Sequence, residues 1–271
     1  MKYKNKDVVI DYVEYGEGIP ILMIHGYSVD KTCMINSFEP IFKTVRGFKR
    51  VYIDLPHMGE SNRPESISSS DDYLSLIISF IKDVGFKEYL VTGYSYGGYL
   101  ARGLQENTSN CIGAALVCPV QEAYRKNRTL PEEEVLYVDD FIKNYEGYID
   151  ESFGNYQIQT EYTFKRHNLD YKEAFEKANF EVLSKIFNNH YELDIVFKKE
   201  IESPTLILLG KQDSVVGYED MLNYIENYKR LTLSIIDRAG HNLMTEQVEL
   251  FELHIKKWLG NYNGDFEGTT I

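Results

Sequence analysis

The sequence contains few cysteines, and their arrangement excludes two kinds of site. Only three occur among 271 residues, an odd number: Cys33, Cys111 and Cys118. Their spacings match neither the ligand pattern of a structural zinc site nor the Cys-x-x-Cys motif of a redox protein. We therefore expect three free and mostly buried thiols in a protein of the reducing cytoplasm.

Positive charge and long apolar runs are also scarce. The 29 Lys and Arg residues stand against 42 Asp and Glu, which gives a formal net charge of −13. A chain this acidic repels nucleic acid and anionic membrane surfaces, so neither is an expected partner. No apolar run reaches membrane-spanning length. The residues after Met1 lead into a strand-like segment, so we expect no signal peptide. The expected partner is a small molecule, and nothing in the sequence indicates an oligomeric state.

The most informative stretch that is present is Gly93-Tyr94-Ser95-Tyr96-Gly97. A short apolar run precedes it and a helical pattern follows as far as Asn107, which predicts a strand, a sharp turn and a helix. This is the context of a nucleophile elbow, in which a serine hydroxyl projects from a strained turn. A plain glycine-rich turn carries the same pattern, so a base, an acid and a second oxyanion donor must come from elsewhere in the chain.

Apolar runs bounded by turn residues predict the strands of a mostly parallel sheet. The predicted strands are 7–15 (one or two antiparallel edge strands), 20–24, 49–56, 89–91, 111–119, 203–209 and 231–236. The predicted helices are 37–42, 73–84, 99–107, 218–228 and 245–259. Strands that alternate with helices in this way predict an α/β fold with right-handed crossovers.

The alternation stops between Gln121 and Lys199, where no buried-strand run occurs and charged helical patterns are expected at 130–145 and 171–188. We divide the chain accordingly into four parts. These are a first part of the core at 1–120, a helical insertion at 121–199, a second part of the core at 200–262 and a flexible tail at 263–271. The insertion is a candidate lid over the carboxyl edge of the sheet, and a purely structural excursion is the alternative.

Polar residues follow the predicted strands at the edge where α/β proteins bind ligands. His25 and Gly26 end the strand at 20–24, which makes the Tyr27 amide a candidate oxyanion donor, while His25 is expected to brace the loop. Asp54, at the end of the next strand, is a candidate acid by position. Because it precedes the elbow and a better placed acid follows, we expect Asp54 to brace its loop.

Two later loops complete a candidate catalytic set. Asp213 follows the strand at 203–209, and His241 follows the last strand, at 231–236. Together with Ser95 they give the chain order Ser, Asp, His. In such a set the histidine acts as base and the carboxylate orients it.

The motifs that carry a family resemblance occur in order along nearly the whole chain: His25-Gly26, Asp54-Leu55-Pro56, Gly59-Glu60-Ser61, Gly93 to Gly98, Gly210 to Asp213, and Gly240-His241. In these motifs the chain resembles α/β-hydrolases with a single lid. The resemblance implies a mostly parallel, eight-stranded sheet with helices on both faces and a helical cap inserted after the sixth strand. This chain has His57 where the family usually has glycine, a departure in a loop.

The resemblance also implies roles and a reaction. Ser95 attacks a carbonyl group, and His241 takes its proton and later donates it to the leaving group. Asp213 orients His241, although in some relatives the acid follows an earlier strand, a place that Glu122 would fill. No metal or organic cofactor is implied. Serine at the elbow argues against a dehalogenase, which has aspartate there.

The expected activity is that of a carboxylesterase on a small substrate enclosed by the lid. The amides of Tyr27 and Tyr96 would hold the oxyanion of the reaction. Hydrolysis of a carbon–carbon bond and aminopeptidase or amidase action remain open as alternatives. So does a non-catalytic receptor, because fold alone does not fix function.

Overall fold

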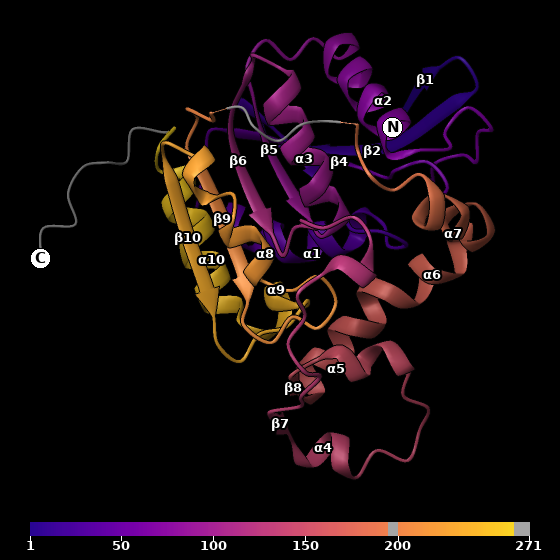
Figure 1. The fold of residues 1–271 in the computed structure, drawn as a ribbon, viewed down its shortest axis with the longest axis vertical. Coiled ribbons are helices and arrows are strands. Elements are labelled where there is room, and N and C mark those ends of the chain that lie inside the picture. Colours follow the sequence, from indigo (N-terminus) through magenta and orange to yellow (C-terminus); the bar gives the residue numbers. More distant parts are fainter. Residues whose placement is uncertain (195–199, 263–271) are drawn as a thin grey trace, which may run out of the picture.

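A single eight-stranded sheet forms the centre of the computed structural model, which describes residues 1–194 and 200–262 (Figure 1). Its strands are β1 (Lys2–Asn5), β2 (Val8–Tyr15), β3 (Ile19–Ile24), β4 (Phe48–Ile53), β5 (Tyr89–Tyr94), β6 (Cys111–Val117), β9 (Thr205–Gly210) and β10 (Leu231–Ile236). Their order across the sheet is β1-β2-β4-β3-β5-β6-β9-β10. β2 pairs antiparallel with β1 and β4, and the other pairs are parallel. The predicted mostly parallel, eight-stranded sheet is confirmed.

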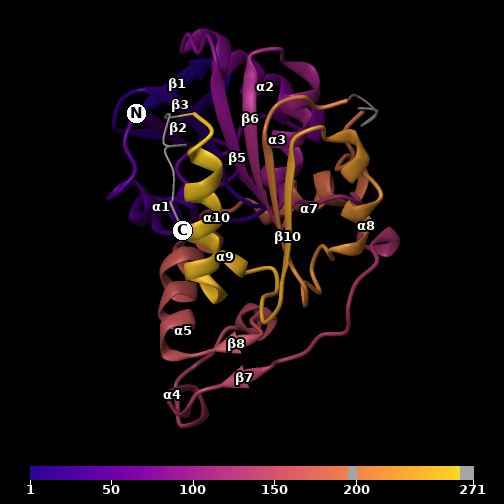
Figure 2. The same cartoon turned by 90° about the vertical axis from the view of Figure 1, so that its left-hand side faces the viewer.

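Helices cover both faces of this sheet (Figure 2). They are α1 (Lys31–Phe42), α2 (Ser70–Asp83), α3 (Tyr96–Asn107), α8 (Glu219–Leu222), α9 (Leu243–Glu246) and α10 (Val248–Leu259). α1 and α10 lie on one face, and α2, α3 and α8 lie on the other. In α2 the residues at helical spacing, among them Leu74, Ile77 and Ile81, are buried against the sheet. Burial of this apolar stripe supplies most of the helix's stability.

Caps and breaks move several helix ends away from the predicted positions. α1 begins well before the predicted 37–42 because the Asp30 carboxylate caps it, accepting a hydrogen bond of 2.8 Å from the Thr32 N–H. The predicted helix at 245–259 is divided at Gln247, whose ψ of 55° lies outside the helical region. The predicted 218–228 helix is only α8 followed by a 3-10 turn at Ile225–Asn227.

The segment between β6 and β9 lies mostly beyond the carboxyl ends of the parallel strands, toward the bottom of Figure 1. It contains α4 (Asp140–Lys143), α5 (Glu161–His167), α6 (Glu173–Lys177), α7 (Phe180–Asn189) and the two short strands β7 (Tyr137–Val138) and β8 (Ile158–Gln159). Single turns of other helix types lie at Arg125–Asn127, Glu151–Asn155 and Asn168–Lys172. We call 121–194 the insertion. The predicted end of the insertion at 199 and the predicted tail at 263–271 lie outside the described residues.

The predicted helix at 130–145 is wrong, since only α4 is helical there. The amides of Leu136 and Tyr137 instead donate to the Gln157 carbonyl, at 2.9 and 3.0 Å, and pair this stretch with β8. Residues 132–137 are exposed, so this stretch buries little of the apolar surface that would stabilise a helix. The predicted 171–188 helix is broken at Ala178, and Asn179 then caps α7.

The three cysteines and the backbone of His57 can be compared with what the sequence predicted. Cys33, Cys111 and Cys118 are buried and free, as predicted. His57, which stands where the resembling family has glycine, has a φ of 67°. That backbone region is open to glycine at no cost but strained for other residues, which explains the usual choice of glycine.

The turn between β5 and α3 is packed so closely that it excludes a side chain at two positions. A Cβ atom on Gly93 would lie 2.2 Å from the Gly97 carbonyl oxygen. A Cβ atom on Gly97 would lie 2.1 Å from the Ile24 carbonyl oxygen at the end of β3. Both contacts are with backbone, which cannot move aside without shifting the sheet.

We predict that Gly97→Ala lowers the free energy of unfolding by about 2–3 kcal/mol, because the added methyl group overlaps the backbone of β3. The measurement is urea unfolding followed by circular dichroism. Gly154→Ala is the matched control, since its Cβ would meet nothing within 4 Å, and its stability is expected to change little. Equal stability of Gly97→Ala and the parent protein would contradict the close packing described for this turn.

Candidate active site

Ser95 lies at the turn between β5 and α3 in a strained backbone conformation, with φ 54° and ψ −116°. Three hydrogen bonds hold this conformation. The Ser95 N–H donates to the Val117 carbonyl at 3.0 Å, and the Ser95 carbonyl accepts from the N–H groups of Tyr99 and Val120, both at 3.1 Å. Strain of this kind persists only where the surroundings enforce it, and it is typical of functional sites.

The structure brings Ser95, His241 and Asp213 into one hydrogen-bonded chain. The Ser95 hydroxyl donates to His241 Nε2 at 2.9 Å, and His241 Nδ1 donates to Asp213 Oδ2 at 2.9 Å. Asp213 is fully buried, and its Oδ1 accepts from the N–H groups of Val215 and Val216 at 2.9 and 3.0 Å. The carboxylate is therefore fixed in place. A chain of this geometry can move a proton from the hydroxyl to the imidazole.

The loop after β3 lies directly against Ser95. A Cβ atom on Gly26 would lie 3.3 Å from Ser95 Cβ, so the absence of a side chain there lets the loop approach. The backbone N–H groups of Tyr27 and Tyr96 find no acceptor among the described residues. The Tyr96 N–H is one of the unused donors at the start of α3, where the helix dipole also favours negative charge.

The side chains of the same two tyrosines contact the insertion. The Tyr27 hydroxyl donates to the Leu183 carbonyl in α7. The Tyr96 ring stacks on Tyr191, just beyond α7, with 4.8 Å between ring centroids. The residues that present the two free amides therefore also attach the insertion to the sheet. The high tyrosine content of the sequence gave no sign of this cluster.

His25 and Asp54 brace loops near the site. His25 is fully buried, and both of its ring nitrogens are occupied: Nε2 accepts from the Leu55 N–H at 2.9 Å and Nδ1 donates to the Gly26 carbonyl at 2.7 Å. Burial lowers the pKa of His25 and favours its neutral form. Neither residue has a hydrogen bond to Ser95 or His241 among the described residues.

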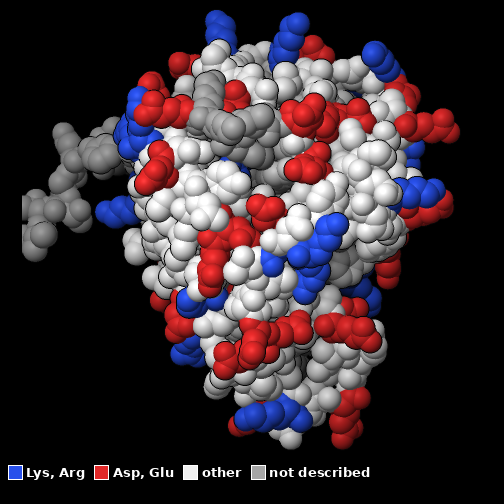
Figure 3. Space-filling model, viewed as in Figure 1, with Lys and Arg blue, Asp and Glu red and all other residues white. Residues whose placement is uncertain are grey.

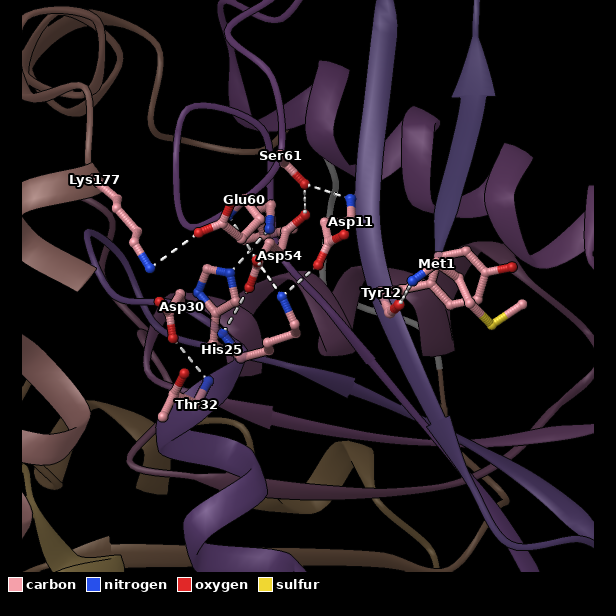
Figure 4. A network of polar contacts seen from close by, with 12 residues as sticks. Met1, Asp11, Tyr12, His25, Asp30, Thr32, Asp54, Glu60, Ser61 and Lys177 are labelled. Carbon is pink, nitrogen blue, oxygen red and sulfur yellow. Dashed lines mark hydrogen bonds and ion pairs between the residues drawn. The ribbon is translucent and has the colours of Figure 1, made fainter. Parts of the chain in front are cut away.

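Figure 4 shows the braced carboxylate of Asp54, which is fully buried. Its Oδ2 accepts from Lys31 Nζ at 2.6 Å and from the Glu60 N–H at 2.8 Å, and its Oδ1 accepts from the Lys31 N–H at 2.8 Å. Lys31 Nζ also contacts Asp11 at 2.6 Å. These contacts use the carboxylate fully and hold the loop after β4 against the start of α1, as expected from the sequence.

Glu122, the alternative acid, has no described hydrogen bond from its carboxylate to His241. Its backbone carbonyl instead accepts from Arg128 Nε at 2.8 Å. Burial raises the pKa of Glu122, and nearby acidic residues act in the same direction. Asp213 is the carboxylate that contacts His241 in this structure.

Glu246 is a partly buried carboxylate near the site that the sequence did not reveal. Its Oε2 accepts from the Gly240 N–H at 2.7 Å, beside His241, and its Oε1 accepts from the N–H groups of Gln157 and Ile158 in the insertion at 2.5 and 3.2 Å. Burial raises the pKa of Glu246 to about 7, although these three N–H groups act in the opposite direction. Glu246 thus connects the loop of His241 to β8.

A cavity of about 300 Å³ opens at Ser95 and His241, between the sheet edge and the insertion. Much of its wall is apolar or aromatic, formed by Val29, Tyr94, Val120, Tyr171, Phe175, Phe187, Tyr191, Val215 and Val216. Polar groups come from Ser152, His167 and Asn242, and charged groups come from Arg125 and Arg128. A largely apolar cavity with a few polar groups is typical of a small-molecule site. The sequence offered no means of assigning these insertion residues to it.

One group of three possible metal ligands occurs among the described residues, and two of its members belong to the chain above. The ligand atoms of Cys118, Asp213 and His241 lie within 4.8 Å of one another. Asp213 and His241 are bonded to each other, and burial raises the pKa of the Cys118 thiol well above its usual range. The ligand atoms of Asp213 and His241 are already engaged with each other and with Ser95, so the hydrogen-bonded chain accounts for this group. In the described part of the chain, no helix is both long and apolar enough to cross a membrane.

Comparison with known proteins shows which proteins and which family this chain resembles. A solved alpha/beta superfamily hydrolase from Oenococcus oeni PSU-1 is similar, with a TM-score of 0.84 and 28% identity over 96% of this chain and 98% of that chain. The 2-hydroxy-6-oxo-6-(2'-aminophenyl)hexa-2,4-dienoic acid hydrolase of Metapseudomonas resinovorans is 25% identical over 250 residues, 89% of this chain and 83% of that protein. Epoxide hydrolase 1 of Caenorhabditis elegans is 23% identical over 293 residues, 96% of this chain and 70% of that protein. The model of the alpha/beta hydrolase family matches residues 21–252, and the chain therefore belongs to this family.

Proposed function

We propose that this protein is a serine hydrolase that cleaves a small carboxylic ester through an acyl-enzyme intermediate. The observation that carries the proposal is the hydrogen-bonded chain from Ser95 through His241 to Asp213, at the wall of a largely apolar cavity. Membership of the alpha/beta hydrolase family supports a hydrolase, and the serine at the elbow sets the type of covalent intermediate.

In the first half of the reaction Ser95 Oγ attacks the ester carbonyl carbon, and its proton passes to His241 Nε2. The carbonyl oxygen becomes an oxyanion, which accepts hydrogen bonds from the free N–H groups of Tyr27 and Tyr96. Each such donor contributes on the order of 3 kcal/mol to lowering the barrier. The tetrahedral intermediate then collapses, the carbon–oxygen bond to the alcohol breaks, and His241 gives its proton to the departing alkoxide.

In the second half a water molecule takes the place of the alcohol. His241 Nε2 accepts a proton from the water as its oxygen attacks the acyl carbon. Collapse of the second tetrahedral intermediate breaks the bond to Ser95 Oγ, which takes back the proton from His241, and the carboxylic acid is released. Asp213 keeps Nε2 in the unprotonated tautomer and stabilises the imidazolium that forms in each half.

The insertion acts as a lid in this proposal. It forms much of the cavity wall through Tyr171, Phe175, Phe187 and Tyr191, and the bonds of Tyr27 and Glu246 attach it to the loops of the site. A cavity of about 300 Å³ matches a small substrate. Exclusion of water from such a cavity strengthens the hydrogen bonds that stabilise the oxyanion.

A second candidate reaction is hydrolysis of a carbon–carbon bond in an unsaturated oxo acid. The similarity over 89% of this chain to a hydrolase of a hydroxy-oxo-dienoic acid favours it. The same three residues would serve, since the leaving group is then a carbanion that His241 protonates. The ester reaction is preferred because an alkoxide is a better leaving group than a carbanion, whose charge would need further polar groups to stabilise it.

We predict that Ser95→Ala lowers kcat for 4-nitrophenyl esters, from acetate to decanoate, by at least about 10⁴-fold, because the nucleophile is removed. The measurement is release of 4-nitrophenol. The dependence of the rate on acyl-chain length shows how long a chain the cavity accepts. Ser75→Ala, at an exposed position of α2, is the matched control and is expected to retain full activity.

Covalent labelling by a fluorophosphonate separates the enzyme from a binding protein. The parent protein should be labelled and Ser95→Ala should not. If Ser95→Ala keeps its esterase activity, the proposed role of Ser95 is wrong. A folded parent protein that hydrolyses no ester yet is labelled at Ser95 would favour the carbon–carbon reaction, and a protein that is not labelled would favour a receptor.

We predict that Asp213→Asn lowers kcat by about 10⁴-fold while the protein stays folded, because an amide in place of the carboxylate favours the wrong imidazole tautomer. Glu122→Gln tests the alternative acid and is expected to retain the parent activity, since its carboxylate makes no described contact with His241. The measurement is kcat for 4-nitrophenyl butyrate. A larger loss in Glu122→Gln than in Asp213→Asn would reverse the assignment.

A further inference from the structure

The charge of the cavity is opposite to that of the chain. The formal net charge of the protein is −13, but the charged side chains that line the described cavity are two arginines, Arg125 and Arg128, with no Asp, Glu or Lys among the lining residues. Both arginines lie at the start of the insertion, in the connection that follows β6. In Figure 3 a group of basic side chains lies near the middle of the face shown, over this connection and among acidic ones.

Arg128 is fixed in position by backbone carbonyls. Its Nε donates to the Glu122 carbonyl at 2.8 Å, and its Nη1 and Nη2 donate to the carbonyls of Val215 and Ala123, both at 2.9 Å. A guanidinium group has five N–H donors, so these bonds leave others to serve a ligand. Carbonyls orient the group but do not neutralise its charge. The result is a preorganised cation at the cavity wall.

No carboxylate within 4.0 Å pairs with either arginine in the described part of the chain. Burial is the largest effect and lowers the pKa of Arg128; Arg125 acts in the same direction, whereas Tyr191, Asp213 and Asp220 raise it. The Glu122 carboxylate is also close enough for Arg128 to lower the pKa of Glu122. The Asp213 carboxylate is bonded to His241, and the Asp220 carboxylate accepts two bonds from Thr129. A partly buried charge without a direct partner is costly, and a bound anion would remove that cost.

Arg125 places a second charge beside the first. It lies in the 3-10 turn Arg125–Asn127, is exposed, and its side chain makes no hydrogen bond or ion pair with any described residue. Like charges placed together repel each other, and the charge of Arg125 accordingly lowers the pKa of Arg128. Hydrogen bonds to carbonyls hold the Arg128 side chain in place, whereas no such bond holds the Arg125 side chain, which can turn toward a ligand in the cavity.

We infer that the cavity takes a substrate that carries a free carboxylate, which pairs with Arg125 and Arg128 while its ester group lies at Ser95. This inference rests on the proposed ester hydrolysis for the reaction, but the anion site stands on its own contacts. The planar guanidinium matches a carboxylate in geometry and forms strong charge-assisted hydrogen bonds with it. A ligand with one negative charge suits this wall, because three N–H donors of Arg128 are already used by backbone carbonyls. The substrate class is therefore a small ester that carries one free carboxylate, and a half-ester of a dicarboxylic acid is the simplest compound of this class.

The test compares two esters that differ only in charge: the mono-4-nitrophenyl ester of adipic acid and its methyl ester at the other end. We expect the parent protein to prefer the anionic ester by at least about 10-fold in kcat/KM, mainly through a lower KM, as for one good charged pair. Arg125→Gln should reduce this preference at least about 5-fold. Lys126→Gln removes the same charge one residue away, outside the cavity lining, and should leave the preference unchanged.

Arg125 is the residue to change because Arg128→Gln would leave three backbone carbonyls without their donor and endanger folding. A binding measurement separates the two proposals. Calorimetric titration of adipate into Ser95→Ala should show binding that weakens in Arg125→Gln and at high salt.

Equal rates for the two esters, both dependent on Ser95, would overturn the carboxylate site and leave the ester hydrolase. Binding of adipate that depends on Arg125, without hydrolysis of either ester, would support the carboxylate site and overturn the ester reaction. Absence of both hydrolysis and binding would overturn both.

Discussion

The strained backbone of Ser95 is the constraint on which the rest of the site depends. A positive φ at a non-glycine residue costs on the order of 1–3 kcal/mol, and the surrounding structure must supply that energy. It does so through the bonds of Ser95 to β6 and α3, and through the close contact of Gly97 with the end of β3. The conformation directs the hydroxyl at His241 and leaves the next amide free at the start of α3. The sheet thus supports a turn that an isolated peptide would not keep.

The insertion is attached to the loops that carry the residues of the proposed catalytic site. Tyr96, next to Ser95, stacks on Tyr191 of the insertion, and Tyr27 donates to the Leu183 carbonyl of the insertion. The loop of His241 is connected to the insertion through Glu246, which accepts from Gly240 and from Gln157 and Ile158. A change in the position of α7 would therefore also move the loop that carries the Tyr27 amide. In the proposed mechanism, enclosure of the substrate and formation of the oxyanion site depend on the same contacts. Such coupling is a physical reason for lid contacts to affect kcat as well as KM.

The electrostatics of the protein act at two ranges. At a distance the net charge of −13 repels anions, but salt screens exposed charges over about 8 Å at physiological ionic strength. Within the cavity the nearest charges decide, and among the lining residues these are Arg125 and Arg128. The net charge of the chain argues against nucleic acid as a partner without excluding a small anion. Composition reports the average field, whereas binding follows the local one.

The sequence by itself determined the sheet, the elbow and the order of the three residues proposed for catalysis. Each of those signals is local: an apolar run, then the residues that follow it, so that Ser95, Asp213 and His241 are all assigned to one sheet edge. Tertiary structure decided what depends on distant pairing. The stretch at 130–136 is not helical, because Leu136 and Tyr137 bond to Gln157 across the insertion. Arg128 lines the cavity because carbonyls at 122, 123 and 215 hold it, and Glu246 connects residues far apart in the chain. Neither residue belongs to a periodic pattern, since only the folded chain brings its partners together.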